Sequence, residues 1–141
     1  MIRDITVGLS LKLDTLFGDS YAVHYEDIKQ GLKGPCFFIQ FLDSSTKSII
    51  GTAKFRRHSF DILYFPKRPG SRAEMQCVAY DLVDGLEYIT LQDGSLLRGT
   101  AIRYHITDGV LHFFIDYNLH THVPQATTQM EEVQIETNGR E

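Results

Sequence analysis

"LLRGTAIRYHITDGVLHFFIDYN", residues 96–118, contains the turn that sets the register of the predicted sheet. Asp108–Gly109 favours the positive φ angles of a two-residue hairpin turn. That turn places Thr107 opposite Val110 and puts three apolar cross-strand pairs on one face. These pairs are Ile106 with Leu111, Tyr104 with Phe113, and Ile102 with Ile115. Turn chemistry and hydrophobic pattern agree, so the stretch is predicted to be an antiparallel hairpin.

The other face of this hairpin carries two histidines. The register places His105 opposite His112, Arg103 opposite Phe114 and Ala101 opposite Asp116. Cross-strand Cβ atoms lie about 5 Å apart, which is close enough for two imidazoles to share a metal. Zinc, however, normally takes three protein ligands in catalytic sites and four in structural ones. The pair supplies two, so we expect no metal and no cofactor, with a small metal-dependent enzyme using His105 and His112 as the alternative.

Two further histidines follow in the chain. His120 and His122 share a face with each other, but they lie roughly 27 Å or more beyond His112 along an extended strand. The histidines therefore form two separate pairs unless the chain folds back after Asn118. We interpret them as side chains of a wet sheet face or of an interface.

Two amphipathic helices are predicted. Apolar residues at helical spacing run from Ile2 to Phe17, and Gly18 stands where helices commonly end. The second helix begins at Ser71, and Glu74 has the spacing at which the two side chains cap each other's backbone N–H groups. Its apolar stripe is typical of a core-facing helix. The stripe consists of Met75, Val78, Ala79, Leu82 and Leu86.

Three strands are predicted between the helices. Residues 21–25 alternate as a half-buried strand does, and "CFFIQFLD", residues 36–43, is apolar on both faces. In residues 51–65, Ala53 and Phe55 occupy odd positions whereas Phe60, Ile62 and Tyr64 occupy even ones. This phase change predicts a β-bulge or bend at residues 57–59, with a short break between two strands as the alternative. Asp93–Gly94 predicts another tight turn.

The element order predicts an α+β domain with a mostly antiparallel sheet, two helices packed on one face, and an extended C-terminal arm. Residues 1–123 are expected to form a single domain. Residues 124–141 are too polar for a core but contain Met130, Val133 and Ile135 as possible anchors. We interpret them either as a frayed terminus or as an arm that orders on a neighbouring subunit.

Composition restricts the class of protein. The net charge is −4, and Lys and Arg form no basic stripe, which argues against a nucleic-acid surface. The nearest cluster, "KFRRH" at residues 54–58, is interpreted as the solvated face of a strand. The sequence has no membrane-length apolar run and no pattern of a signal peptide, so we expect a soluble cytosolic protein with Cys36 and Cys77 reduced.

Motifs of catalysis are incomplete in this sequence. It has no glycine-rich phosphate loop, nucleophile elbow, Cys-x-x-Cys or paired histidines on a helix. His105–Thr107 matches one half of a paired His-x-Thr motif, but no second copy occurs. We therefore expect no catalytic residues. Two helices cover only one face of a sheet, so the doubly apolar strand and Phe114 point instead to a partner surface.

Four stretches together resemble the tail terminator family of tailed phages, prophages and phage-tail-like bacteriocins, especially those with contractile tails. They are "EDIKQGLKGPCFFIQ" at 26–40, "FDILYFP" at 60–66, residues 96–118 and "MEEV" at 130–133. The resemblance implies a small α+β subunit that forms a ring, typically a hexamer, on the head-proximal end of the tail tube. Such a ring stops tube polymerisation and presents a surface to the neck or sheath.

The resemblance also implies partners and an interface. Partners would be other copies of the chain, the tail tube protein, and sheath or neck proteins, with no nucleic-acid sequence recognition and no membrane. The protein would assemble in the host bacterial cytoplasm and end in a virion or tail-like particle; a monomeric neck adaptor is the alternative. The residues expected at ring or tube contacts are Lys29, Gln30, Gly31, Leu32, Lys33, Pro35, Phe114, Met130, Val133 and Ile135.

Overall fold

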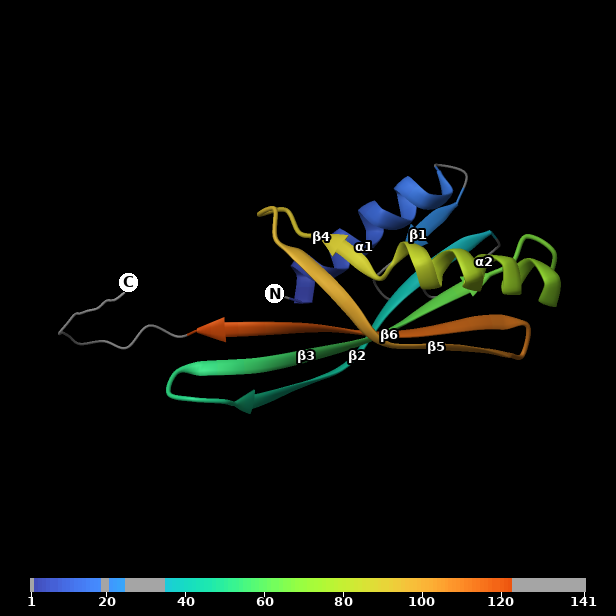
Figure 1. Ribbon diagram of the computed structural model, residues 1–141. Helices are drawn as coiled ribbons and strands as arrows, with labels where there is room; N and C mark the ends of the chain where they lie inside the picture. Colours follow the sequence, from blue (N-terminus) through green and yellow to red (C-terminus); the bar gives the residue numbers. More distant parts are fainter. Residues whose placement is uncertain (1, 19–20, 25–34, 123–141) are drawn as a thin grey trace.

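The computed structural model describes residues 2–18, 21–24 and 35–122. In these ranges the chain forms two helices and a six-stranded sheet, which confirms the α+β class (Figure 1). The predicted C-terminal arm lies outside the described residues. The elements in chain order are α1 Ile2–Phe17, β1 Ala22–His24, β2 Cys36–Ser48, β3 Ala53–Phe65, α2 Arg72–Gly85, β4 Tyr88–Thr90, β5 Leu96–Thr107 and β6 Val110–His122.

The sheet has the order β1-β2-β3-β6-β5-β4. The β1–β2 pair is parallel and the other four neighbouring pairs are antiparallel. Both helices lie on the same side of the sheet (Figure 1). α1 contacts β1 and β2 near one edge and β4 at the other, so the sheet curls around this helix as a half-barrel.

The core lies between the helices and this inner face of the sheet. Helix α1 contributes Ile5, Leu9 and Leu13, which recur every four residues and are at most 1% exposed. Gly18, with a φ of 85°, follows the helix, and its N–H bonds to the carbonyl of Asp14, as expected for a glycine after a helix end. The five predicted stripe residues of the second helix are all buried. Both predicted helix faces are thus confirmed except at the ends of α1, where Ile2 and Leu16 are 40% and 38% exposed.

The capping prediction for α2 is correct for one of its two hydrogen bonds. Ser71 Oγ accepts from the backbone N–H of Glu74 at 3.3 Å. The Glu74 carboxylate does not return the bond; it accepts from the Tyr64 hydroxyl and from the backbone N–H groups of Lys67 and Arg68. Burial opposes ionisation of Glu74, but these three hydrogen bonds lower its pKa below the usual range. Glu74 therefore ties the β3–α2 connection to the sheet.

The predicted hairpin is confirmed near its turn and wrong further away. Asp108 and Gly109 have φ angles of 52° and 74°, and the pairs from Thr107–Val110 to Arg103–Phe114 form as expected. Beyond Arg103 the register shifts, so Asp116 pairs with Thr100 rather than with Ala101, and Ile102 does not pair with Ile115. Ala101 has a φ of 53°, and this strained residue forms a bulge that bends β5.

The other predicted bulge is in the wrong strand. β3 runs without interruption, and its register with β6 is unbroken from Ala53–His122 to Tyr64–Leu111. The shift lies in the neighbouring strand, at Leu42 of β2, between the pairs Phe41–Phe60 and Asp43–Ser59. Phe55 simply lies on the outer face of β3, where it contacts His120 at a ring-centroid distance of 5.0 Å.

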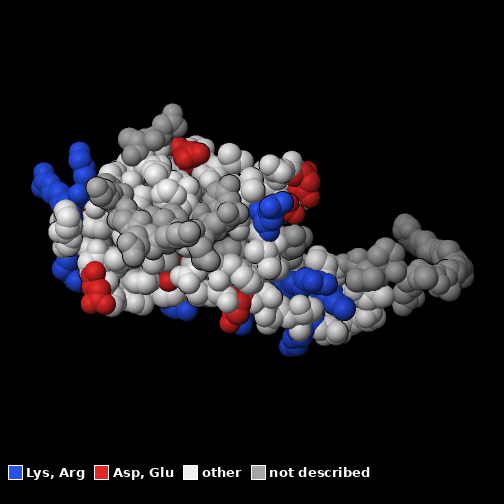
Figure 2. All heavy atoms as spheres, turned by 180° about the vertical axis from the view of Figure 1, so that it is seen from behind, with Lys and Arg blue, Asp and Glu red and all other residues white. Residues whose placement is uncertain are grey.

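Three strands continue beyond the part of the sheet that the helices cover (Figure 1). We call this three-stranded extension the arm; it comprises residues 43–57 and 118–122, and the rest of the described chain is the hub. Residues 42–51 are all exposed, including the turn residues Ile49 and Ile50 at 49% and 80%. Several Lys and Arg side chains gather along the arm in Figure 2, and others lie at the opposite end of the hub. No helix in the described ranges is long and apolar enough to cross a membrane.

Candidate functional site

The outer face of the sheet, opposite the helices, carries a cluster of polar and aromatic side chains. Alternation along β6 buries Phe113 and Ile115 in the core and turns His112 and Phe114 outward. The confirmed hairpin register brings His105 beside His112, with ring centroids 5.3 Å apart and an interplanar angle of 20°. The predicted proximity of these two histidines is therefore confirmed.

A third side chain joins this pair from β3. His112 Nδ1 lies 2.9 Å from Oδ2 of Asp61, which is only 5% exposed. The other carboxylate oxygen, Oδ1, is buried and has no hydrogen-bond partner within the described residues. An unsatisfied buried acceptor costs about 1–3 kcal/mol. The cluster therefore contains a buried polar atom with no donor among the described residues.

Phe114, one of the predicted interface residues, lies in the middle of this face. The guanidinium carbon of Arg103 is 4.8 Å from the centroid of its ring, and the His105 ring is 5.4 Å away. Phe114 is half-buried as a result. Cation–π contacts of this type contribute about 0.5–1 kcal/mol at exposed sites. Because the contact is weak, Arg103 covers the Phe114 ring but does not prevent a partner from contacting it.

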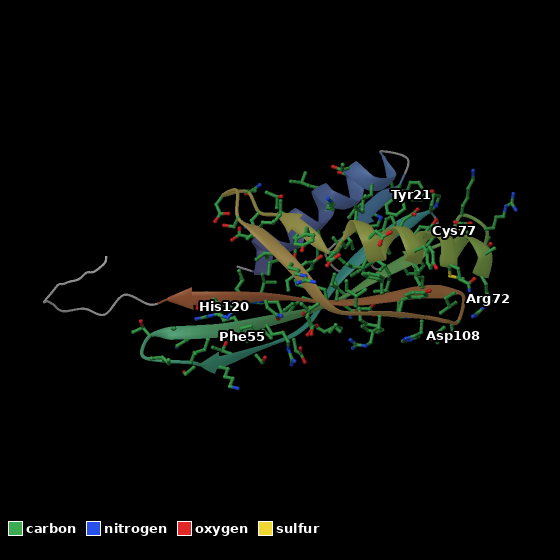
Figure 3. The ribbon with its side chains drawn as sticks, in the orientation of Figure 1. Tyr21, Phe55, Arg72, Cys77, Asp108 and His120 are labelled. Carbon is green, nitrogen blue, oxygen red and sulfur yellow. The ribbon has the colours of Figure 1, made fainter. Side chains whose placement is uncertain are left out.

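The cluster does not assemble a metal site. Among the described residues no group of three or more His, Cys, Asp or Glu side chains is arranged to hold a metal ion. His120 lies on the arm beside Phe55 (Figure 3), at the other end of β6 from His112. The side chain of His122 lies outside the described residues. Cys36 is buried, Cys77 lies exposed on α2, and both are free.

A cleft lies at the opposite side of the hub, between α1 and the residues that follow β4. It has a volume of about 350 Å³, and Lys12 is the one ionisable side chain among the described residues that line it. The lining residues are Gly8, Leu11, Lys12, Thr15, Thr90, Leu91 and Gln92.

The arm is the second unusual surface of the molecule. It carries the four cations Lys47, Lys54, Arg56 and Arg57 and the single acid Asp43. Arg57 lies 4.0 Å from Asp116, and Arg56 Nε donates to the Thr121 hydroxyl at 3.2 Å. Lys47 and Lys54 make no ion pair within the described residues. The prediction of a solvated strand face for residues 54–58 holds for exposed Arg57, whereas Arg56 is half-buried and His58 is 4% exposed.

His58 marks the junction between arm and hub. It lies on the inner face, with its ring centroid 6.5 Å from that of Phe41, and its Nδ1 has no hydrogen-bond partner among the described residues. Burial lowers the pKa of His58; a hydrogen bond with the backbone of Tyr117 opposes this effect, and the nearby charge of Arg56 adds to it. The imidazole is therefore held neutral where the arm begins.

Most of the predicted interface residues fall outside the described residues. Pro35 is half-buried immediately before β2, and Phe114 lies on the outer face. The structure does not describe Lys29, Gln30, Gly31, Leu32, Lys33, Met130, Val133 or Ile135. Sequence reasoning missed the arm, although one signal was present: "DSSTKS", residues 43–48, is polar at every position, as in a strand exposed on both faces.

Comparison with known protein families identifies this chain. A family profile described as "Phage tail terminator protein" matches residues 4–129, which includes α1 from its third residue onward, α2, all six strands and the outer-face cluster. A search of curated proteins found no match.

Proposed function

This chain belongs to the phage tail terminator family, and from this premise we propose that it closes the head-proximal end of a tail tube as a ring of identical subunits. Family membership gives the protein a role in tail structure or assembly, which is a structural rather than a catalytic task. The ring, which we take to be a hexamer, stops tube polymerisation and provides the joining surface for neck or sheath proteins. The family match is the observation that carries this proposal.

The surfaces of the molecule are consistent with assembly. The half-buried Phe114 lies on a sheet face that neither helix covers, close to Asp61, whose Oδ1 has no hydrogen-bond partner among the described residues. Burying that face against a neighbouring subunit would remove the exposed part of the Phe114 ring from water. We assign Phe114, Pro35 and the adjoining residues 29–33 to contacts within the ring or with the tube.

The chain is proposed to have two functional parts. Residues 1–123 act as the folded subunit, and residues 124–141, with Met130, Val133 and Ile135, act as a C-terminal segment that orders on assembly. The subunit is synthesised and assembled in the host bacterial cytoplasm and remains in the finished virion or tail-like particle. Its partners are other copies of the chain, the tube protein, and sheath or neck proteins of a contractile tail.

Native mass spectrometry over a concentration series tests self-association. A metal-free ring, or a shift from monomer to ring with rising concentration, is expected. A strict monomer that also fails to bind the ends of purified tail tubes in electron micrographs contradicts the proposal. A monomer that binds neck proteins but leaves tube length unregulated favours a neck adaptor instead.

Deletion of residues 124–141 separates assembly from folding. The truncated chain should keep the circular dichroism spectrum and unfolding midpoint of the full chain but form fewer rings or capped tubes. Unchanged assembly by the truncated chain would remove residues 124–141 from the proposed interface.

A further inference from the structure

The arm presents an open sheet edge. Within the described ranges, β1 pairs with β2 only at residues 36–38, so the outer edge of residues 39–48 has no strand beside it. β3 occupies the other edge of β2 as far as Ser48. Unpaired backbone N–H and C=O groups on such an edge accept an additional strand by ordinary ladder hydrogen bonds.

The composition of this edge restricts which strand it accepts. Lys47 on β2, together with Lys54, Arg56 and Arg57 on β3, outnumbers Asp43, so the arm has a formal charge of +3. The bulge at Leu42 and the lysine near the end of the edge are devices that discourage non-specific strand pairing. An acidic strand would meet a complementary field, whereas a basic strand would be repelled.

The chain itself contains an acidic segment of this kind outside the described residues. Residues 124–141 hold Glu131, Glu132, Glu136 and Glu141 against the single cation Arg140, a formal charge of −3. Within them "EVQIE", residues 132–136, alternates polar and apolar side chains with the period of a β-strand. The negative charge of this segment is complementary to the positive charge of the arm, and its alternation is that of a strand able to pair with the edge of β2.

The direction of β6 favours pairing with another subunit. β6 runs antiparallel to β3 and ends at His122 opposite Ala53, so at the arm tip it points away from the hub (Figure 1). A chain that continues in this direction leaves its own subunit, whereas pairing with its own β2 would require it to reverse. Nine residues, 123–131, precede the alternating segment and span at most about 30 Å.

We propose that residues 132–136 of one subunit add as a strand to the free edge of β2, residues 39–48, in the next subunit. The inference rests on the proposed ring and deepens it by naming a contact. Because the segment and the edge are different surfaces, the contact is heterologous, and repetition around an axis closes a ring. Each copy then donates one strand and accepts one.

Disulfide capture between separately prepared chains tests this contact. Exposed Cys77 is first replaced by serine, and full-length Ser45→Cys and Val133→Cys variants are then mixed under mild oxidation. Covalent dimers that contain one chain of each kind are expected. Thr107→Cys, an exposed position at the far end of the hairpin, serves as the matched control and should give no such dimer with Val133→Cys.

The double variant Ser45→Cys/Val133→Cys distinguishes pairing between subunits from pairing within one chain. Pairing between subunits gives covalent dimers and larger ladders, whereas pairing within one chain gives a cross-linked monomer and overturns the inference. Equal dimer yields at Ser45 and Thr107, or no dimer at any protein concentration, also overturn it.

Charge reversal provides a second measurement. Glu132→Lys with Glu136→Lys should reduce the dimer yield, and Lys47→Glu with Lys54→Glu in the accepting chain should restore it; failure of this restoration contradicts the charge argument. Native mass spectrometry of the same samples reports the ring separately. A ring without Ser45–Val133 capture refutes the strand exchange and leaves the proposed function intact, whereas absence of the ring and of tube capping refutes the proposed function.

Discussion

The hub and the arm share three strands but are stabilised in different ways. In the hub, the inner face of β3 buries Phe60, Ile62 and Tyr64 completely beneath the helices. In the arm, the same strands continue with the same β3–β6 register, but residues 43–51 have no buried side chain. The hub is therefore held by apolar burial, whereas the arm is held mainly by backbone pairing. The paired strands therefore extend beyond the part of the sheet that the apolar core stabilises.

Phe113 and Phe55 test this contrast most strongly. Phe113 is fully buried, so Phe113→Ala should lower the free energy of unfolding by about 3–5 kcal/mol. Phe55 contacts His120 in the arm, and Phe55→Ala should cost only about 1 kcal/mol. Urea unfolding followed by circular dichroism measures both. Equal losses would mean that the arm is packed as tightly as the hub.

Gly99 tests how closely β5 approaches the core. A Cβ at this position would lie 2.8 Å from Cγ1 of Ile115 and 3.2 Å from the carbonyl oxygen of Leu86. Gly99→Ala should therefore lower the free energy of unfolding by about 1–3 kcal/mol. Ile115→Val shortens the side chain that obstructs the new methyl group, so the double variant should lose less than the sum of the single losses. Strict additivity would contradict this packing.

Much of the hub was predictable because its periodicities reflect burial on one side. The stripe of α2 and the hairpin pairs next to Asp108–Gly109 were correct for this reason. The predicted capping hydrogen bond from the Glu74 carboxylate was wrong, because this carboxylate accepts instead from the backbone N–H groups of Lys67 and Arg68, which precede the helix. Sequence spacing indicates which groups are able to meet within one turn, but the fold of the preceding connection decides which of them do.

The arm was misread because a strand exposed on both faces has no contrast between its odd and even positions. Phe55 was taken as evidence of a bulge in β3, whereas it lies on the outer face of a regular strand. The outer-face cluster was predictable only in part. The turn brings His105 to His112, but Asp61 reaches His112 through the long-range β3–β6 pairing, which no local turn determines.

His58 provides a pH test at the junction of the two regions. Because burial lowers its pKa in the folded state below the ordinary value of about 6.5, its contribution to stability is complete above that pH. The contribution is lost as the pH falls from 6.5 toward the folded-state pKa, since the unfolded chain then binds the proton more tightly. The protection factors of arm amides in hydrogen exchange, which are referred to the intrinsic exchange rate at each pH, should fall over this range.

His58→Gln removes this titration, so its unfolding free energy should vary less than that of the parent chain below pH 6.5. His105→Gln is the matched control, because that imidazole is exposed on the outer face. If the control flattens the pH profile as much as His58→Gln does, the pH sensitivity does not arise at the junction.

Ile50 at the arm tip should give the smallest effect on stability. Its side chain is 80% exposed, so Ile50→Ser should change the free energy of unfolding by about 0.5 kcal/mol or less. Ile39, earlier in β2, is 2% exposed, and Ile39→Ser should cost several times more because it places a hydroxyl in the core. An exposed isoleucine at the end of a basic, polar ribbon contributes almost nothing to its own subunit. If it instead contributes to assembly, Ile50→Ser should weaken ring formation in native mass spectra at unchanged stability. A loss of stability comparable to that of Ile39→Ser would show that the arm tip packs against its own chain.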